Sequence, residues 1–363
     1  MSYKIIDLFC GAGGFSCGFE QENFESILAI DKWEDAIKTY NENHKNKCGQ
    51  NIDINNFTNE MIRDLIKKNG EIDGIIGGPP CQGFSMVGTR DHKDERNNLY
   101  LQYVRFVEQI KPKFFILENV KGLLNLHKGF FKKDIIKRFS DLGYNVEFKI
   151  LKASEYGVPQ SRERVFFVGL NKDIFARTFF KFPKGDKKNF VSTKEALSDL
   201  PSLDNNEDET KYKFDPKNEY QKFMRQEVRG NGIKNNEKTI HQEKTIKIIS
   251  MVPDGGSIKD LDEKYYEVRN YDSAFKRMNS QLPSTTIDCG HRNYFHYEEN
   301  RVPTVRESAR IQSFPDNFIF LGSKTSQYTQ VGNAVPPLLG RTIAKKMKNY
   351  LERSKKNDKN RFY

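Results

Sequence analysis

The sequence has no long apolar run, and only 36% of its 363 residues are hydrophobic. A helix that spans a bilayer needs about 20 consecutive apolar residues, and no stretch approaches that length. The first residues, MSYKIIDLF, also lack the basic stretch and long apolar segment of a secretion signal. We therefore expect a cytoplasmic protein that has no membrane partner.

Cysteine is scarce as well. The chain has five cysteines, an odd number, and no Cys-x-x-Cys pair. A disulfide framework needs paired cysteines, and a structural zinc site needs closely spaced ligands. The sequence argues against both and predicts no metal site, so any cysteine that takes part in chemistry acts as a single thiol.

Acidic residues are outnumbered, with 49 Asp and Glu against 60 Lys and Arg, a net charge of +11. A basic balance of this size suits a polyanion such as DNA or RNA. Lysine is abundant along the whole chain, however, and solvated surface lysines alone would give the same figure. Charge therefore leaves both interpretations open.

Short apolar runs alternate with segments of helical period in the first half of the chain. Strands are expected at residues 4–9, 26–30, 72–76, 113–117, 144–150 and 164–170. Helical patterns lie between them, at residues 33–44, 99–110 and 130–142. This alternation predicts an α/β fold with a doubly wound, mostly parallel sheet, in which ligands bind at the carboxyl ends of the strands.

The alternation fades after Asn171. The following stretch is rich in Asn, Lys, Asp and Glu but keeps apolar residues such as Ile248 and Ile249, which predicts a second, smaller, irregular domain. A helical pattern returns at residues 338–351. We expect a cofactor-binding domain at 1–171, a small domain at 172–324, and a segment at 325–363 that rejoins the first.

A glycine-rich turn follows the first expected strand, in DLFCGAGGFS. Gly11 and Gly13 would let the backbone approach a ligand closely, although a tight strand-to-helix turn would need the same residues. Asp31 ends the next expected strand, where an acid typically binds a ribose diol, and Asp53 lies at a further candidate strand end. Together these residues favour an adenosine-containing cofactor.

A single thiol follows two prolines in GGPPCQGFS. The prolines fix two backbone torsions and remove two N–H donors, so Cys81 is expected at a rigid position on the carboxyl edge of the sheet. A structural cysteine more often fills an apolar gap inside a strand or helix. Cys81 is therefore a candidate nucleophile, and the polar residues 82–98 after it are expected to form a mobile lid.

Charged residues lie at two further strand ends. Glu118, in LENV, could hold a proton beside the thiol, or it could be an acid that favours a helix N-terminus. In QSRER, Arg162 and Arg164 would share one face of an extended chain and could bind a carbonyl or a phosphate.

In this order, the motifs resemble those of the DNA (cytosine-5) methyltransferases of bacterial restriction-modification systems. The resemblance covers nearly the whole chain outside residues 171–300. It includes two closing motifs, RESARIQSFPDNF at 306–318 and QVGNAVPP at 330–337. It implies the Rossmann-like fold of S-adenosylmethionine-dependent methyltransferases and the methylation of a flipped cytosine.

The resemblance also implies catalytic roles. Cys81 would attack carbon 6 of the cytosine as a thiolate, after which carbon 5 accepts the methyl group. Glu118 would contact N3 and the exocyclic amine of the base. Arg162 and Arg164 would hold the base O2 and a nearby phosphate.

A set of cofactor contacts follows from the same resemblance: Phe9, Gly11, Gly13, Asp31, Asp53, Pro80, Leu99, Asn333 and Val335. Asp31 would bind the ribose and Asp53 the adenine amine, and S-adenosylhomocysteine would be the product. The family usually has Glu followed by an apolar residue where this chain has Asp31 followed by Lys32 and Trp33. The side chain that covers the adenine therefore stays open.

Double-stranded DNA is the implied partner, with target recognition in residues 172–324 and with Gln82 or Ser85 near the gap left by the base. We expect a monomer and a restriction endonuclease encoded nearby. The alternative is a tRNA cytosine-5 methyltransferase with the same motifs, although the recognition segment of ~100 residues that the resemblance implies within this domain, from 171 to about 271, favours DNA. A silent DNA-binding regulator would not need the reactive residues, and a dehydrogenase would need Gly-x-Gly-x-x-Gly spacing, which is absent.

Overall fold

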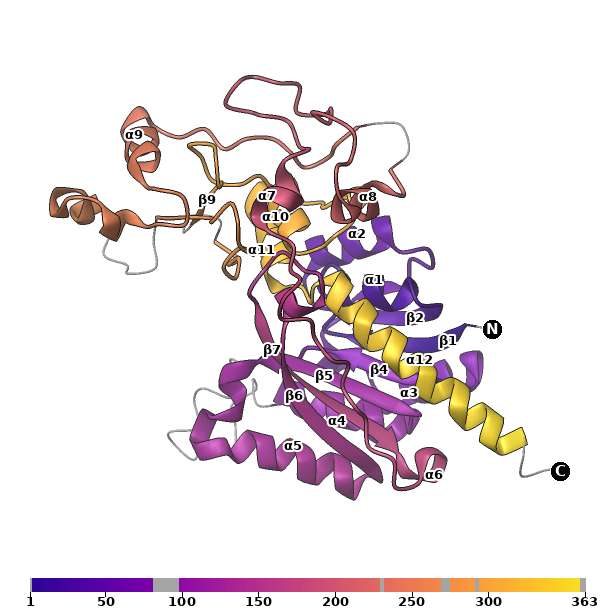
Figure 1. The fold of residues 1–363 in the computed structure, drawn as a ribbon. Helices are drawn as coiled ribbons and strands as arrows, with labels where there is room; N and C mark the ends of the chain where they lie inside the picture. Colours follow the sequence, from indigo (N-terminus) through magenta and orange to yellow (C-terminus); the bar gives the residue numbers. More distant parts are fainter. Residues whose placement is uncertain (1, 81–97, 229–231, 269–274, 291–293, 360–363) are drawn as a thin grey trace. The chain divides into compact units, whose positions relative to one another are not determined.

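The computed structural model describes the chain except for residue 1 and residues 81–97, 229–231, 269–274, 291–293 and 360–363 (Figure 1). The chain forms two compact units. The first unit comprises Met1–Lys152, Glu163–Gly185 and Leu339–Tyr363, and the second comprises Ala153–Arg162 and Asp186–Leu338. The chain therefore passes between the units four times.

A seven-stranded sheet forms the centre of the first unit. Its strands are β1 (Tyr3–Leu8), β2 (Phe24–Asp31), β3 (Gly49–Asn51), β4 (Gly74–Gly77), β5 (Phe114–Val120), β6 (Tyr144–Lys152) and β7 (Glu163–Asn171). Their order is β3-β2-β1-β4-β5-β7-β6, and β7 alone runs opposite to the other six strands. The predicted mostly parallel sheet is confirmed. The strand order reverses direction between β1 and β4, where such sheets bind ligands.

Helices connect or follow these strands. They are α1 (Gly14–Glu20), α2 (Glu34–Asn43), α3 (Asn59–Asn69), α4 (Asn98–Ile110), α5 (Phe130–Asp141), α6 (Lys172–Phe175) and α12 (Pro337–Lys359), with the 3₁₀ turns η1 (Ile54–Asn56), η4 (Lys121–Leu124) and η5 (Leu126–Gly129). The helical patterns expected in the first half correspond to α2, α4 and α5. The 3.6-residue period of their apolar side chains thus predicted these helices correctly.

Both faces of the sheet are buried, because successive side chains of a strand point to opposite sides. On one face, Ile6 and Phe115 belong to a core cluster that includes side chains of α4 and α5. On the other, Phe19, Phe24 and Phe114 pack against one another, with the Phe19 and Phe24 ring centroids 4.9 Å apart. Two predicted site residues, Asp31 and Glu118, lie at or near the carboxyl ends of β2 and β5.

The second unit is built largely of irregular chain. Its elements are η6 (Ala153–Tyr156), α7 (Thr193–Leu197), α8 (Glu219–Arg225), α9 (Glu243–Met251), η7 (Ile258–Asp260), η8 (Glu263–Val268), α10 (Val305–Ile311) and α11 (Lys324–Asn333), with two short strands, β8 (Lys276–Arg277) and β9 (Tyr294–Phe295). A small apolar cluster surrounds α9 and includes Ile249, Val252 and Phe295. These short elements agree with the loss of strand–helix alternation after Asn171.

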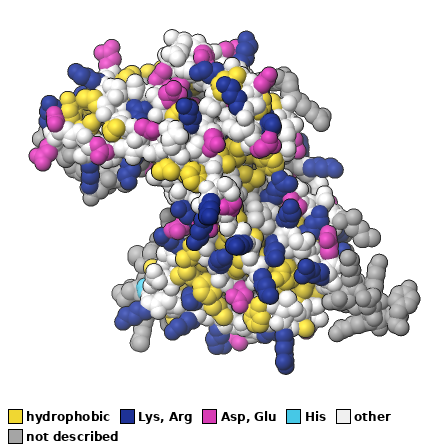
Figure 2. Space-filling view, in the orientation of Figure 1, with side chains coloured by type: hydrophobic (Ala, Val, Ile, Leu, Met, Phe, Trp, Pro, Cys, Tyr) yellow, Lys and Arg dark blue, Asp and Glu magenta, His cyan; other side chains and the backbone are white. Residues whose placement is uncertain are grey.

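Charged side chains of both signs are spread over the face of the molecule drawn in Figure 2. The basic excess is uneven along the chain. From Pro337 to the last residue, nine Lys and Arg stand against two acids, so this segment carries +7 of the net +11. Among the residues that the structure describes, no helix has the length and apolar character needed to cross a membrane.

Candidate cofactor and catalytic site

The backbone turns sharply between β1 and α1, in a segment named here the glycine loop (residues 9–13). Phe9, Gly11 and Gly13 have positive φ angles of 61°, 53° and 90°. Such angles suit glycine and strain a phenylalanine. A Cβ added at Gly11 would meet no atom within 4 Å, whereas one at Gly13 would lie 2.2 Å from Nε2 of His44. Gly11 thus borders space that a ligand could fill, while Gly13 is required by close packing.

The carboxylate of Asp31 holds the glycine loop at the end of β2. Its Oδ2 accepts a hydrogen bond from the Gly11 N–H at 2.9 Å, and its Oδ1 accepts one from the Trp33 N–H at 3.0 Å. Burial raises the pKa of Asp31, and the backbone hydrogen bonds oppose that shift. Lys32 is exposed and Trp33 is half-buried. Since each carboxylate oxygen can accept a second hydrogen bond, Asp31 can still bind a hydroxyl group.

Buried polar groups form a chain beside the glycine loop. The Ser16 hydroxyl donates to Oδ2 of Asp7 at 2.6 Å, and the Tyr40 hydroxyl donates to Oγ of Ser16 at 3.1 Å. The Tyr40 ring stacks on His44 with the centroids 4.0 Å apart, and Nδ1 of His44 lies 2.8 Å from Oε2 of Glu20. Burial raises the pKa of Asp7 to about 7. This network was not predicted from the sequence, because the contacts of Tyr40 with Ser16 and of His44 with Glu20 each join residues 24 positions apart.

Asp53 and Leu99 come from two neighbouring segments of the first unit. Asp53 begins the turn η1, where its Oδ1 accepts the N–H of Asn55 at 2.9 Å. Leu99, near the start of α4, is half-buried against the main apolar cluster. Helix α4 contacts both η1 and α3. The two predicted cofactor residues thus stand on elements that pack directly against each other.

The segment after β4 contacts β5 where GGPP begins. This contact region, Gly77–Pro79 with Glu118 and Asn119, is named here the joint between β4 and β5. A Cβ on Gly77 would come 2.1 Å from a carbonyl oxygen of β1, and a Cβ on Gly78 would come 2.9 Å from Oε2 of Glu118. Nδ2 of Asn119 donates a hydrogen bond to the carbonyl oxygen of Pro79 at 2.8 Å. The two glycines are therefore required by close contacts, and the asparagine of the ENV motif fixes the proline segment.

Three predicted site residues, Cys81, Gln82 and Ser85, lie outside the described residues. Pro80, the last described residue before them, is exposed. The contact of Pro79 with Asn119, two residues before Cys81, is the part of the joint that lies nearest to Cys81 in the chain.

Glu118 and Arg164 form an ion pair at this edge of the sheet. Nε of Arg164 lies 3.1 Å from Oε1 of Glu118, and the two side chains are only 17% and 11% exposed. Nη1 of Arg164 also donates to the carbonyl oxygen of Glu163 at 2.8 Å. The structure thus brings together Glu118, Arg164 and Gly78, with Oε1 of the carboxylate toward the arginine and Oε2 toward the glycine.

Three other predicted site residues, Arg162, Asn333 and Val335, belong to the second unit. Arg162 is 2% exposed, and Val335 is also buried. Oδ1 of Asn333 accepts a hydrogen bond from the thiol of Cys289 at 2.9 Å. Although Arg162 and Arg164 are only two residues apart, they lie in different units.

Gln160, the first residue of QSRER, was not assigned a role from the sequence. Its side chain is fully buried. Its Nε2 donates to the side chain of Gln312, its Oε1 accepts the N–H of Ile287 at 3.2 Å, and its backbone pairs with Ser284. Gln160 therefore connects three segments of the second unit that are far apart in the sequence.

Arg277, on β8, is buried in the second unit and makes five hydrogen bonds. Its acceptors lie between 2.6 and 3.0 Å away and are the carbonyl oxygens of Ile249, Val252, His296 and Glu299 and Oδ1 of Asn300. A guanidinium has five N–H donors, so one side chain satisfies acceptors on both α9 and the turn at 296–300.

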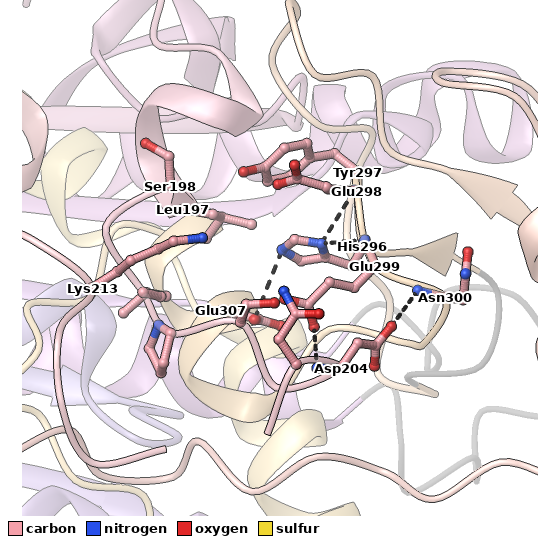
Figure 3. A pocket seen from close by; sticks show the side chains of 14 residues that line it. Leu197, Ser198, Asp204, Lys213, His296, Tyr297, Glu298, Glu299, Asn300 and Glu307 are labelled. Carbon is pink, nitrogen blue, oxygen red and sulfur yellow. Dashed lines mark hydrogen bonds and ion pairs between the residues drawn. The ribbon is translucent and has the colours of Figure 1, made fainter. Parts of the chain in front are cut away.

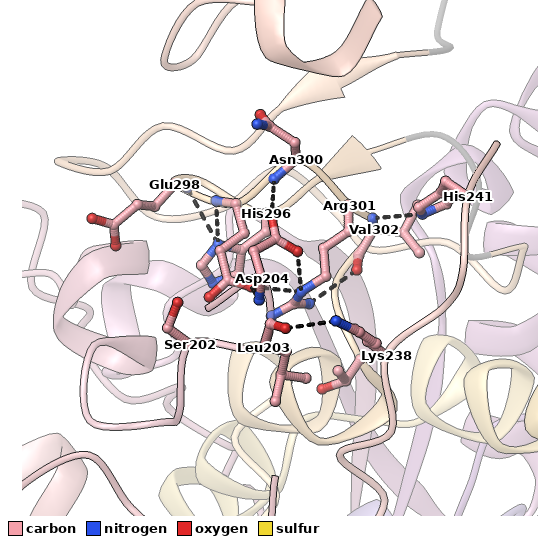
Figure 4. A network of polar contacts seen from close by, with 12 residues as sticks. Ser202, Leu203, Asp204, Lys238, His241, His296, Glu298, Asn300, Arg301 and Val302 are labelled. Carbon is pink, nitrogen blue, oxygen red and sulfur yellow. Dashed lines mark hydrogen bonds and ion pairs between the residues drawn. The ribbon is translucent and has the colours of Figure 1, made fainter. Parts of the chain in front are cut away.

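The same turn borders a cavity of about 290 Å³ (Figure 3). Arg301, labelled in Figure 4, lies between two acids. Its Nε is 2.6 Å from Oε2 of Glu299, and its Nη2 is 2.7 Å from Oε1 of Glu307. Nδ1 of His296 accepts the backbone N–H groups of Glu298 and Glu299. Burial lowers the pKa of His296 to about 4. Because Arg301 and the backbone engage these side chains, the network stabilises the second unit itself.

Comparison with known proteins identifies the family. The model of the C-5 cytosine-specific DNA methylases matches residues 3–349. The type II methyltransferase M.DdeI of Desulfomicrobium norvegicum is 40% identical over 96% of this chain and 89% of its own length. The type II methyltransferase M1.HphI of Haemophilus parahaemolyticus is 36% identical over 95% of this chain and 86% of its own.

Solved structures agree. A prophage-encoded protein of Escherichia coli, described as a DNA modification methyltransferase, superposes with a TM-score of 0.79 at 28% identity, covering 97% of this chain and all of the other. The Dnmt2 methyltransferase of S. pombe, at 17% identity, has a TM-score of 0.61 over 96% and 98% of the two chains, which shows the fold alone. By its family match and its relatives, the chain belongs to the C-5 cytosine-specific DNA methylases and is a DNA (cytosine-5) methyltransferase of the type II restriction-modification kind.

Proposed function

We propose that the chain flips a cytosine out of a specific short duplex sequence and methylates its carbon 5 through a covalent adduct with Cys81. The observation that carries this proposal is the joint between β4 and β5, where Asn119 binds Pro79 and Glu118 lies against Gly78. The joint supports a rigid path of the chain into Cys81 and a carboxyl group close to that path.

Carbon 5 of cytosine is a weak nucleophile, so the ring has to be activated first. Addition of the Cys81 thiolate to carbon 6 forms a C–S bond and converts the ring into an enamine, whose carbon 5 is nucleophilic. S-Adenosylmethionine, implied by the family, would supply an electrophilic methyl group and leave as S-adenosylhomocysteine. Loss of the proton from carbon 5 then breaks the C–S bond and releases Cys81.

Glu118 is proposed to read the edge of the base. Arg164 holds Oε1 of its carboxyl group, so the group is oriented before the base arrives. A carboxyl group in this position accepts a hydrogen bond from the exocyclic amine of cytosine, which thymine lacks, and contacts N3 as charge develops on the ring. Arg162 and Arg164 are proposed to hold the base O2 and a phosphate.

The glycine loop and its neighbours fit S-adenosylmethionine. Gly11 borders open space, and the partly engaged Asp31 beside it can accept hydrogen bonds from ribose hydroxyls. Asp53 is proposed to accept the adenine amine. The remaining proposed contacts are Phe9, Gly13, Pro80, Leu99, Asn333 and Val335.

We propose that residues 1–171 hold the reaction, that 172–324 read the DNA, and that 325–363 rejoin the first domain. Flipping the base costs a few kcal/mol of unstacking. Gln82 and Ser85 would approach the gap that the base leaves in the duplex. The basic net charge favours phosphate contacts. The enzyme would act as a cytoplasmic monomer and protect host DNA from a restriction endonuclease encoded nearby.

Expression in a host that lacks cytosine methylation, followed by bisulfite sequencing, tests this function. We expect protected cytosines in one short sequence context and none when Cys81→Ser is expressed at the same level. Fully converted DNA, together with methylated host RNA, would favour the tRNA alternative. Fully converted DNA and unmodified RNA from a folded protein would contradict both.

A further inference from the structure

Arg105 joins the two segments that carry Asp53 and Leu99. It is half-buried on α4 and reaches across to η1 and α3. Its Nη2 donates to the carbonyl oxygens of Ile54 at 3.3 Å and Phe57 at 2.6 Å. Its Nη1 donates to Oδ1 of Asn59 at 2.7 Å.

The guanidinium is itself held in place. Its Nε donates to Oε1 of Gln102, one turn earlier on α4, at 2.6 Å. The planar group therefore has one side fixed to its own helix and the other bound to the segment 54–59. Such a fork fixes the direction of its acceptors as well as their distance, which a lysine could not do.

The segment that carries Asp53 is restrained on its N-terminal side, where the Ile52 N–H donates to the carbonyl oxygen of Asp31 at 3.1 Å. Strand β3, which precedes it, has only three residues and pairs only with β2, at the edge of the sheet. Ile54 and Phe57 are buried, so apolar packing keeps the turn attached, but packing alone restrains the orientation of a turn weakly. Arg105 supplies the directional contacts, because it binds carbonyl groups on both sides of the 3₁₀ turn.

We infer that Arg105 is a positioning residue that sets the orientation of the Asp53 turn relative to Leu99, and thereby the selectivity of the site for the adenine amine. This inference rests on the proposed cofactor roles of Asp53 and Leu99. Arg105 acts through the turn and touches neither cofactor nor base.

The experiment measures the binding of S-adenosylhomocysteine and of S-inosylhomocysteine, whose ring carries an oxo group in place of the amine, by titration calorimetry. Wild type should prefer the adenine compound. In Arg105→Gln, we expect affinity for S-adenosylhomocysteine to fall about tenfold and the preference to shrink, because Asp53 is no longer held toward the amine. The KM for S-adenosylmethionine should rise while kcat stays within about threefold.

Two further variants complete the test. Arg105→Lys keeps the charge without the fork and should lose part of the preference. Arg138→Gln on α5, which breaks a partly exposed pair with Asp134, is the matched control and should change neither affinity nor preference. An Arg105→Gln protein that melts at a lower temperature but keeps the wild-type preference would show a purely structural role and overturn the inference.

Asp53→Asn separates this inference from the proposed function. If Asp53→Asn removes the preference and both Arg105 variants retain it, the Arg105 inference is wrong and the role of Asp53 stands. If Asp53→Asn also retains the preference, the adenine role of Asp53 is wrong, and the Arg105 inference fails with it.

Discussion

The two units bury different kinds of side chain. The core of the first unit is rich in aromatic side chains, such as the stacked rings of Phe115 and Phe139. Its seven-stranded sheet pairs backbone groups with one another. The largest fully buried side chains of the second unit are instead three arginines, Arg301, Arg306 and Arg310. A region with short helices and two-residue strands leaves many carbonyl groups without a partner in regular structure. Guanidinium groups supply the missing donors.

Arg306 illustrates this difference. Its three nitrogens donate to the carbonyl oxygens of Lys234, Pro315 and Phe318. Burial lowers the pKa of Arg306, because the charged guanidinium loses its hydration in the interior. The comparison teaches that the first unit gains stability from apolar area, whereas the second depends on buried charges that must remain paired.

The largest expected effect is on a buried ion pair of the second unit. Arg310 lies between Asp199 and Asp316, and all three side chains have no exposure. Arg310→Met should destabilise this unit by about 3–5 kcal/mol, because two buried carboxylates lose their main partner. Hydrogen–deuterium exchange across α10 measures the local free energy of opening.

Lys222→Gln is the matched control, since it breaks an exposed pair with Glu219. It should cost less than about 1 kcal/mol. Equal effects of the two substitutions would contradict the account of the second unit.

A slightly smaller effect is expected in the first unit, from Asp7. Burial raises its pKa in the folded protein to about 7, from 3.8. The contribution of Asp7 to the free energy of unfolding is therefore fully present below pH 3.8 and is lost as pH rises through 7. Asp7→Asn should remove this loss, worth up to about 4 kcal/mol at pH 8. Trp33, the only tryptophan, lies in the first unit and reports its unfolding by fluorescence in denaturant.

Asp64→Asn, on the exposed face of α3, is the control for Asp7 and should leave the pH dependence unchanged. A wild-type first unit that is equally stable at pH 4 and pH 8 would show that Asp7 is not strained by burial.

The second unit should respond to pH in the opposite direction. Burial lowers the pKa of His296 in the folded protein to about 4, from 6.5. Its stabilising contribution is therefore present above pH 6.5 and is lost as pH falls through 4, by about 3 kcal/mol. Glu307, which faces the ring at 3.8 Å, opposes this shift, and Arg301 reinforces it.

His296→Gln should abolish this acid sensitivity in α10 exchange, and the exposed His127→Gln of the first unit should not. If both units lost stability together on acidification, the contrast drawn between them would be wrong.

The smallest effect in free energy is expected at the joint between β4 and β5. Gly78→Ala places a Cβ 2.9 Å from Oε2 of Glu118 and should rotate that carboxyl group. We expect kcat to fall roughly 10- to 100-fold while binding of S-adenosylhomocysteine is retained. Gly122→Ala, with no atom within 4 Å of its added Cβ, is the control and should be nearly silent in single-turnover assays.

The sequence predicted the sheet well, because buried parallel strands appear as apolar runs and the helices between them have a clear period. It also located Asp31 at the end of a strand, as the structure has it, and Glu118 near one, since β5 continues to Val120. It indicated a further strand end at Asp53, two residues after β3 ends, but gave that strand no range, because three residues are too few to show a pattern. The contacts of Asn119 with Pro79 and of Gln160 with Gln312 join residues 40 and 152 positions apart, and local periodicity carries no information about such pairs.

The second unit was the least predictable region for the same reason. The roles of its arginines depend on distant carbonyl and carboxylate groups, so Arg277 and Arg310 could equally have been surface residues on sequence grounds. Their absence from apolar patterns was the available signal, and it did not distinguish a buried guanidinium from a solvated one.

The covalent adduct with Cys81 is the central claim, and trapping it is the most direct test. Once bisulfite sequencing has given the target, a duplex with 5-fluorocytosine at the methylated position is incubated with the enzyme and S-adenosylmethionine. Fluorine cannot leave carbon 5 as a proton does, so the C–S bond should persist, and mass spectrometry should place the methylated DNA on Cys81. A Cys81→Ser protein should trap nothing. DNA attached at another residue, or a fully active enzyme that forms no adduct, would contradict the account.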